Sequence, residues 1–140
     1  MTQEQKELLL KDLCARLPYG VKFVIDNGQN NVRTLTGIDE AIPYEDWQMC
    51  AFARGMSAIP IEDIKPYLFP LSSMTEEQKQ EYTYIVNYIS SDDTENWKEG
   101  EFIYVEQFSQ LMHFYHINHL DYMGLIPMGL AIDATELNIY

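Results

Sequence analysis

The chain has 140 residues, of which 46 % are hydrophobic and 13 % aromatic; this composition suits one packed domain over residues 1–140 and excludes a mainly disordered chain. Asp and Glu number 22 against 9 Lys and Arg, a net charge of −13, which disfavours direct binding to nucleic-acid phosphates or to an anionic membrane surface. There is no apolar run of about 18 residues, and residues 1–7 do not resemble a signal peptide, so we expect a cytoplasmic protein. We also expect that the protein needs no cofactor.

The first predicted element is a helix over residues 3–17. Thr2 and Gln5 have the spacing of a capping box, which satisfies free backbone amides at a helix start. The apolar face of this helix repeats every three or four residues and comprises Leu10, Leu13, Cys14 and Leu17. Because Cys14 falls on that face and no metal-ligand spacing occurs, we predict that Cys14 and Cys50 are small buried thiols, neither joined in a disulfide nor reactive.

Three or four antiparallel strands are predicted in the first half of the chain. These segments are rich in β-branched and aromatic residues and cover 21–26, 32–38, 47–54 and, as a short edge strand, 58–61. Asn27 and Gly28 are a strong hairpin signal, so the first two strands should pair with each other. We expect a polar loop over 39–43, one helical turn over 62–65 and irregular chain over 67–71, because prolines flank and interrupt this last segment.

Two helices are predicted in the second half. Thr75 and Gln78 form a second capping box, which begins a helix over 76–90. Its apolar face comprises Tyr82, Ile85, Val86 and Ile89. The next helix begins at residue 101 or 102 and ends at 118. Its apolar residues lie on two sides, with Val105, Phe108, Met112 and Tyr115 on one and Phe114 and Ile117 on the other. Such a helix is either sandwiched or exposes a patch to a partner.

After the last helix, Asp121 can cap a short turn over 122–126, and residues 128–134 form an apolar tail. The strands cluster before about residue 62 and the helices, apart from the first, after about residue 75. This order is typical of an α+β fold and not of alternating βαβ units. We therefore predict an α+β domain with a small, curved antiparallel sheet of the SH3-like kind.

All three histidines of the chain lie within seven residues, at His113, His116 and His119. On a helix His113 and His116 are close enough to share a metal ion, and Asp121 or Glu106 could complete a site. His119 would project about 9 Å further along the axis than His113. The alternative, which we favour, is that the histidines line an amphipathic helix end and bond to backbone or solvent.

Three other patterns favour a structural role over catalysis or ligand binding. Ser72 and Ser73 precede a helix, but no Gly-x-Ser-x-Gly elbow surrounds them. The acidic residues Asp92, Asp93 and Glu95 lack the spacing and the glycine of an EF-hand loop, so we expect a solvated loop. Gly124 and Gly129 lack the strand–turn–helix context of nucleotide binding.

The tyrosine content and the acid content each suggest a surface that could bind a partner. The chain has 10 tyrosines, and Tyr82, Tyr84 and Tyr88 crowd one predicted helix, of which Tyr84 or Tyr88 should face outward. Tyrosine is favoured at protein interfaces, although a half-buried tyrosine with a hydrated hydroxyl is the simpler interpretation. From residue 99 onward there are acids but no Lys or Arg. Such a surface could imitate nucleic acid towards a basic partner, or serve solubility alone.

Three stretches together carry a resemblance to a known group of proteins. They are residues 11–22 (KDLCARLPYGVK), 64–75 (IKPYLFPLSSMT) and 120–131 (LDYMGLIPMGLA). The combination resembles a group of short, uncharacterised proteins of gut Bacteroides-type bacteria and their phages or prophages. In that group the third stretch often begins with paired histidines and carries Arg after Asp-Tyr, where this chain has Asn118, His119 and Met123. The resemblance implies a cytosolic bacterial or phage protein and no particular activity.

Three functional hypotheses follow. The first is a non-enzymatic protein that binds another protein or a second copy of itself, as an accessory factor of a phage or mobile element. The second is an acidic nucleic-acid mimic that occupies a basic host protein. The third is a metal-dependent enzyme that uses the region of His113, His116 and His119 together with Asp121.

Overall fold

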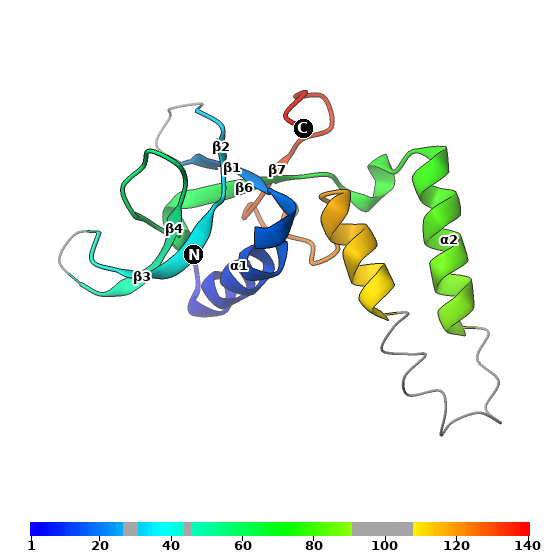
Figure 1. The fold of residues 1–140 in the computed structure, drawn as a ribbon, viewed down its shortest axis with the longest axis horizontal. Helices are drawn as coiled ribbons and strands as arrows, with labels where there is room; N and C mark the ends of the chain where they lie inside the picture. The colour runs from blue at the N-terminus through cyan, green and yellow to red at the C-terminus, as the bar shows by residue number, and fades with distance from the viewer. Residues whose placement is uncertain (27–30, 44–45, 91–107) are drawn as a thin grey trace, which may run out of the picture.

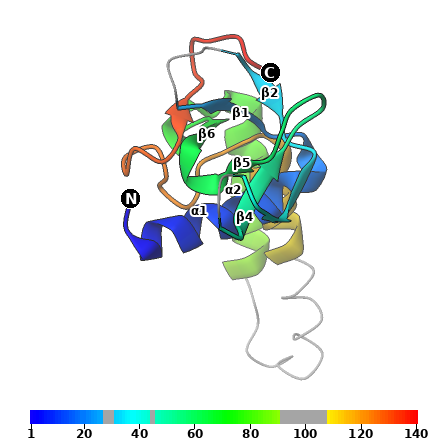
Figure 2. The same cartoon turned by 90° about the vertical axis from the view of Figure 1, so that its left-hand side faces the viewer.

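The computed structural model describes residues 1–26, 31–43, 46–90 and 108–140. It confirms the α+β class, with an N-terminal helix, two small sheets and two later helices (Figure 1). The sheets and α1 (Gln3–Arg16) lie at one end of the molecule, α2 (Glu76–Ser90) lies at the other, and a helix at 108–117 lies between them (Figure 1). Figure 2 shows α1 running beneath the strands. None of the described helices is long and apolar enough to cross a bilayer.

Both predicted capping boxes are present. The Thr2 hydroxyl accepts a hydrogen bond from the Gln5 N–H at 3.1 Å, and the Gln5 side chain accepts one from the Thr2 N–H at 2.9 Å. Thr75 and Gln78 repeat this exchange at 3.2 and 2.9 Å. The starts of α1 and α2 are therefore fixed by local hydrogen bonds that the sequence encodes directly.

The predicted apolar face of α1 is confirmed only in part, because Leu13 is buried and Leu10 and Leu17 pack against the main core, but Cys14 does not. The residues that α1 buries are Leu9, Asp12, Leu13 and Arg16. Cys14 is exposed instead of buried, whereas Cys50 is buried as predicted, and both are free thiols. The periodicity misses part of the buried face because Asp12 and Arg16 pair with each other inside the protein, and a hydrophobic pattern assigns no charged residue to the core.

The strands form two sheets and not one. The first sheet has the order β2 (Arg33–Thr34), β1 (Lys22–Ile25), β6 (Ile64–Leu68) and β7 (Ile132–Asp133). The second is antiparallel, with the order β3 (Gly37–Ala41), β4 (Gln48–Phe52) and β5 (Ile59–Pro60). The β1–β2 hairpin, the third strand and the short edge strand are confirmed. The predicted return strand is divided between β2 and β3, so part of the segment expected to be a loop, 39–43, is strand.

The segment 67–71, predicted to be irregular, begins within the central strand of the first sheet. β6 pairs antiparallel with β1 and parallel with β7. Pro66 lies opposite Phe23 in this sheet. The Asp26 N–H donates to the Asp63 carbonyl at 2.8 Å, and because hydrogen-bonded pairs alternate along an antiparallel ladder, the Phe23–Pro66 pair exchanges no hydrogen bonds. The proline therefore removes no ladder bond to β1, which is why a strand tolerates it here.

Short 3-10 turns flank β6. The predicted helical turn near 62–65 is observed as η2 (Ile61–Asp63), and η3 (Leu71–Ser73) leads into α2. Of the third predicted helix, residues 108–117 are helical, and residues 101–107 lie outside the described part of the chain. The predicted cap at Asp121 is confirmed, because its carboxylate accepts hydrogen bonds from the N–H groups of Leu125 and Ile126 at 2.8 and 2.9 Å.

The C-terminal residues return to the first sheet, which the sequence did not predict. β7 adds a parallel strand beside β6, and the chain then runs to Tyr140. The Tyr140 hydroxyl accepts a hydrogen bond from the Lys22 N–H at 2.9 Å and donates one to the Tyr67 carbonyl at 2.8 Å. Lys22 and Tyr67 would be the next pair of the β1–β6 ladder after Phe23 and Pro66. The hydroxyl therefore links the two strands where their direct pairing stops.

Two apolar clusters matter for the site. The main core lies between α1 and the sheets and includes Leu9, Leu13, Phe23, Ile64 and Leu68. A separate cluster joins α2 to the helix at 108–117 through Ile85, Phe114 and Leu120. Phe114 is only 2 % exposed, whereas Phe108 and Ile117 are more than half exposed. The helix at 108–117 is therefore sandwiched, as its two apolar sides suggested, but still exposes part of its apolar surface.

Candidate functional site

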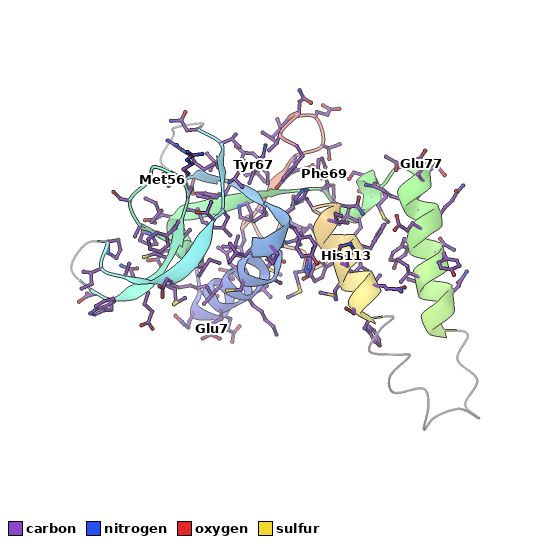
Figure 3. All side chains as sticks on the ribbon, viewed as in Figure 1. Glu7, Met56, Tyr67, Phe69, Glu77 and His113 are labelled. Carbon is purple, nitrogen blue, oxygen red and sulfur yellow. The ribbon has the colours of Figure 1, made fainter. Side chains whose placement is uncertain are left out.

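Two of the histidines, His113 and His116, lie next to the same tyrosine, Tyr19. Nδ1 of His113 lies 3.1 Å from the hydroxyl oxygen of Tyr19, which is in the 3-10 turn η1 (Leu17–Tyr19) that follows α1. The Tyr19 ring centroid is 5.5 Å from that of His113 and 5.2 Å from that of His116. Nε2 of His116 in turn lies 2.8 Å from the Tyr122 hydroxyl. Figure 3 shows His113 on the helix between α1 and α2, so this contact connects η1 to that helix.

The third histidine belongs to a different environment. His119 follows the helix with a φ of 53° and stacks on Tyr140 with ring centroids 3.7 Å apart. Asp121 is buried and caps the following turn, and Glu106 lies outside the described residues. Within the described ranges, no group of three or more His, Cys, Asp or Glu side chains is placed to hold one ion. The metal-dependent hypothesis therefore remains a prediction without a gathered ligand set in this part of the chain.

A buried ion pair lies beside the histidines. Nε of Arg16 lies 2.7 Å from Oδ2 of Asp12, and neither side chain is exposed. Arg16 also donates a 2.7 Å hydrogen bond to the Leu120 carbonyl, and its guanidinium carbon is 5.2 Å from the centroid of the Tyr122 ring. Burial raises the pKa of Asp12, and the charge of Arg16 opposes that rise. The i, i+4 spacing could have suggested the pair, but not its burial.

This environment holds His116 neutral. Burial lowers the pKa of His116 to about 4, and the positive charge of Arg16 adds to the effect. Burial likewise lowers the pKa of His119 to about 4. Since both values lie well below 7, these two imidazoles carry no charge at neutral pH. His116 therefore contacts the Tyr122 hydroxyl, and His119 stacks on Tyr140, as neutral rings at that pH.

An open cavity of about 560 Å³ lies where α2, the helix at 108–117 and η1 approach one another. Its walls are mostly aromatic and apolar, with one carboxylate, and comprise Tyr19, Glu81, Tyr84, Ile85, Ser109, Gln110, Met112, His113, Phe114 and His116. The volume falls within the range of about 300–1,000 Å³ that is typical of ligand pockets. Sequence reasoning singled out Tyr84 and the histidines but missed Tyr19 and Glu81, because only the tertiary structure brings η1 and α2 to this helix.

Among the described residues that line the cavity, no serine is hydrogen-bonded to a histidine. Ser109 lies one helical turn before His113, and both line the cavity, but no hydrogen bond joins them. The predicted structural role of Ser72 and Ser73 fits the start of η3, where the Ser73 hydroxyl donates to the Pro70 carbonyl at 2.7 Å. Gly124 and Gly129 each adopt a φ of 75° in turns.

Of the remaining surface predictions, one is confirmed and the others concern residues that the structure does not describe. Tyr84 is 68 % exposed, as expected of a contact residue, whereas Tyr82 packs against Phe114 and Tyr115. The side chain of Tyr88 and the acidic loop with Asp92, Asp93 and Glu95 lie outside the described residues.

The acidic C-terminal stretch offers fewer surface carboxylates than the sequence suggests. Asp121 is buried and bonded to backbone amides, so it does not contribute to a surface. In the described part of the stretch, Asp133 and Glu136 are the exposed acids. Glu99, Glu101 and Glu106 fall outside the described residues.

No protein-family model, curated protein or solved structure matches the chain.

Proposed function

We propose that this protein is a non-enzymatic binding protein that engages another protein through the cavity between α2 and the helix at 108–117. The observation that supports the proposal is the lining of that cavity, whose described residues include tyrosine, methionine and one carboxylate. Tyrosine and methionine are enriched in protein interfaces because they offer large contact areas. The resemblance to phage and prophage proteins favours an accessory factor of a mobile element. The cytoplasmic location and the SH3-like curvature of the sheets also stay predictions.

The residues around the cavity are suited to recognition. Tyr84 lines the cavity from α2 and is 68 % exposed, and Met112 lines it from the facing helix. Burying such side chains against a partner stabilises a complex in proportion to the apolar area removed from water. The two helices are held together by Ile85 and Phe114, which pack in one apolar cluster and also line the cavity. The binding surface is therefore already fixed by packing between the two helices, so it does not have to become ordered when a partner binds.

The proposal can be tested by comparing two aromatic substitutions in affinity capture from a Bacteroides lysate. Tyr84→Ala removes an aromatic side chain from the cavity, and Trp47→Ala removes a similarly exposed one, 69 % exposed, near the start of β4. We expect one protein to be captured by the wild type and by Trp47→Ala but lost with Tyr84→Ala. Equal capture by all three forms, or no capture by a monomeric wild type, would contradict the proposal.

Light scattering on the same samples identifies a self-partner. If the captured protein is a second copy of this chain, the wild type will show twice the monomer mass and Tyr84→Ala will not. Release of the captured protein by competing DNA would instead favour the nucleic-acid mimic.

A further inference from the structure

We propose that the cavity between α2 and the helix at 108–117 takes an arginine side chain from the partner protein. This inference rests on the proposed function and specifies which chemistry the cavity recognises. It depends on three properties of the lining: its charge, its aromatic surfaces and the position of its acceptors.

The described lining of the cavity carries one negative charge. Among the lining residues that the structure describes, Glu81 is the one acidic residue, and none is Lys or Arg. Glu81 forms no ion pair or hydrogen bond with the residues that the structure describes, in contrast to Glu76, which pairs with Lys79 at 3.3 Å, and Glu62, which pairs with Lys6 at 3.2 Å. The carboxylate is thus available to a cation, and the net charge of −13 draws cations towards the whole protein.

The aromatic surfaces stand beside this carboxylate. Glu81 and Tyr84 are three residues apart on α2, so their side chains are neighbours on the same helical face. The ring of Tyr19 lines the cavity from η1, and its hydroxyl is engaged by His113, which fixes the ring. The faces of tyrosine rings attract cations. A carboxylate next to such rings therefore provides two favourable contacts for one cationic group.

Among cationic side chains these contacts suit arginine better than lysine. The guanidinium group is planar, so it can stack on a tyrosine ring while its edge donates hydrogen bonds to a carboxylate. Ser109 and Gln110, which also line the cavity, offer further oxygen acceptors to its remaining N–H groups. The ammonium group of lysine has three donors and no flat surface, so it would use fewer of these contacts.

Other occupants fit the lining less well. An acidic segment would bring a second negative charge close to Glu81. A purely apolar segment would cover that carboxylate and remove its water without replacing the lost hydrogen bonds, which is costly. The arginine-bearing segment is the occupant that satisfies both the rings and the carboxylate.

The test uses the full-length protein and two blocked tripeptides, Gly-Arg-Gly and Gly-citrulline-Gly. Citrulline has nearly the shape of arginine but no charge. Binding is followed at pH 7.5 and low salt by changes in the amide NMR signals of residues that line the cavity. We expect the arginine peptide to shift the signals of Glu81, Tyr84, Ser109 and His113 and to bind about tenfold more tightly than the citrulline peptide, as one ion pair and one cation–π contact would give.

Two matched substitutions locate the effect. Glu81→Gln removes the charge in the cavity, and Glu77→Gln removes the same charge near the start of α2, outside the cavity lining (Figure 3). We expect Glu81→Gln to weaken the preference for arginine over citrulline, leaving only the part due to the tyrosine rings, and Glu77→Gln to preserve it. Equal binding of the two peptides to the wild type, or equal effects of the two substitutions, would overturn the inference.

The outcome is separable from that of the proposed function. One outcome is that capture of a partner depends on Tyr84 and yet is unaffected by the arginine peptide and by Glu81→Gln. In that case the cavity binds a partner by other chemistry, and only the arginine assignment fails. If the arginine peptide binds at the cavity while no protein is captured, the recognition chemistry holds and the proposed function fails.

Discussion

Replacing Arg16 by methionine should destabilise the protein strongly. The arginine side chain is completely buried, and its Nε lies 2.7 Å from the Asp12 carboxylate. Methionine fills a similar length of space but leaves that carboxylate without a cation, and breaking a buried ion pair in this way costs about 3–5 kcal/mol. The substitution also removes the 2.7 Å hydrogen bond to the Leu120 carbonyl. We therefore expect Arg16→Met to lower the free energy of unfolding by at least about 3 kcal/mol.

The double substitution Asp12→Leu with Arg16→Met should recover most of this loss. Oδ1 of Asp12 and Nη1 of Arg16 are buried and have no hydrogen-bond partner among the described residues. The pair is therefore incompletely satisfied, and exchanging it for apolar side chains of similar size is often neutral or stabilising. We expect the double variant to be within about 1.5 kcal/mol of the wild type.

Urea unfolding at pH 7, followed by circular dichroism, measures all four members of this double-mutant cycle. The expected coupling energy between the two positions is at least about 2 kcal/mol. If Arg16→Met costs less than about 1 kcal/mol, or if the two single losses simply add, then the ion pair does not behave as a buried, mutually dependent pair and the reasoning is refuted.

Three further outcomes follow from single contacts. Tyr140→Phe should lower the free energy of unfolding in urea by about 1–3 kcal/mol, because the Lys22 N–H and the Tyr67 carbonyl both lose their partner; an unchanged midpoint would contradict the role of that hydroxyl. The pKa of His116, near 6.5 when unfolded, is about 4 in the fold, so the unfolded chain binds the extra proton between these values and stability is lost as pH falls from about 6.5 towards 4. An NMR titration that finds His116 near 6.5 would show this wrong. Thr75→Ala should cost about 1 kcal/mol through the lost helix cap, and thermal unfolding that matches the wild type would count against the cap.

Local signals in the sequence were sufficient for several elements. Both capping boxes, the extent of α2 and the β1–β2 hairpin depend on residues only a few positions apart. Hydrogen bonds and turns of this kind form between near neighbours, so the residue types themselves predict them. The order of strands and helices, and with it the α+β class, follows from these elements.

The candidate site could be predicted only in part. The sequence placed the histidines on one helix and one exposed tyrosine on another, but it did not show that Tyr19 would approach His113 and His116 or that Glu81 would face the same cavity. These residues are far apart in the chain. Their approach depends on packing between α1, α2 and the helix at 108–117, for which no short-range pattern exists.

The sequence by itself determined where α1 and α2 begin, that β1 and β2 pair and which class of fold results, because each of these rests on short-range hydrogen bonding and side-chain periodicity. The tertiary structure decided which residues of α1 are buried, since Arg16 of the buried Asp12–Arg16 pair contacts the Leu120 carbonyl and the Tyr122 ring, which are remote in sequence. It also decided that β6 is a central strand, because β1 and β7 come from distant parts of the chain to pair with it. A partner that is remote in sequence leaves no periodic trace in the segment that it will join.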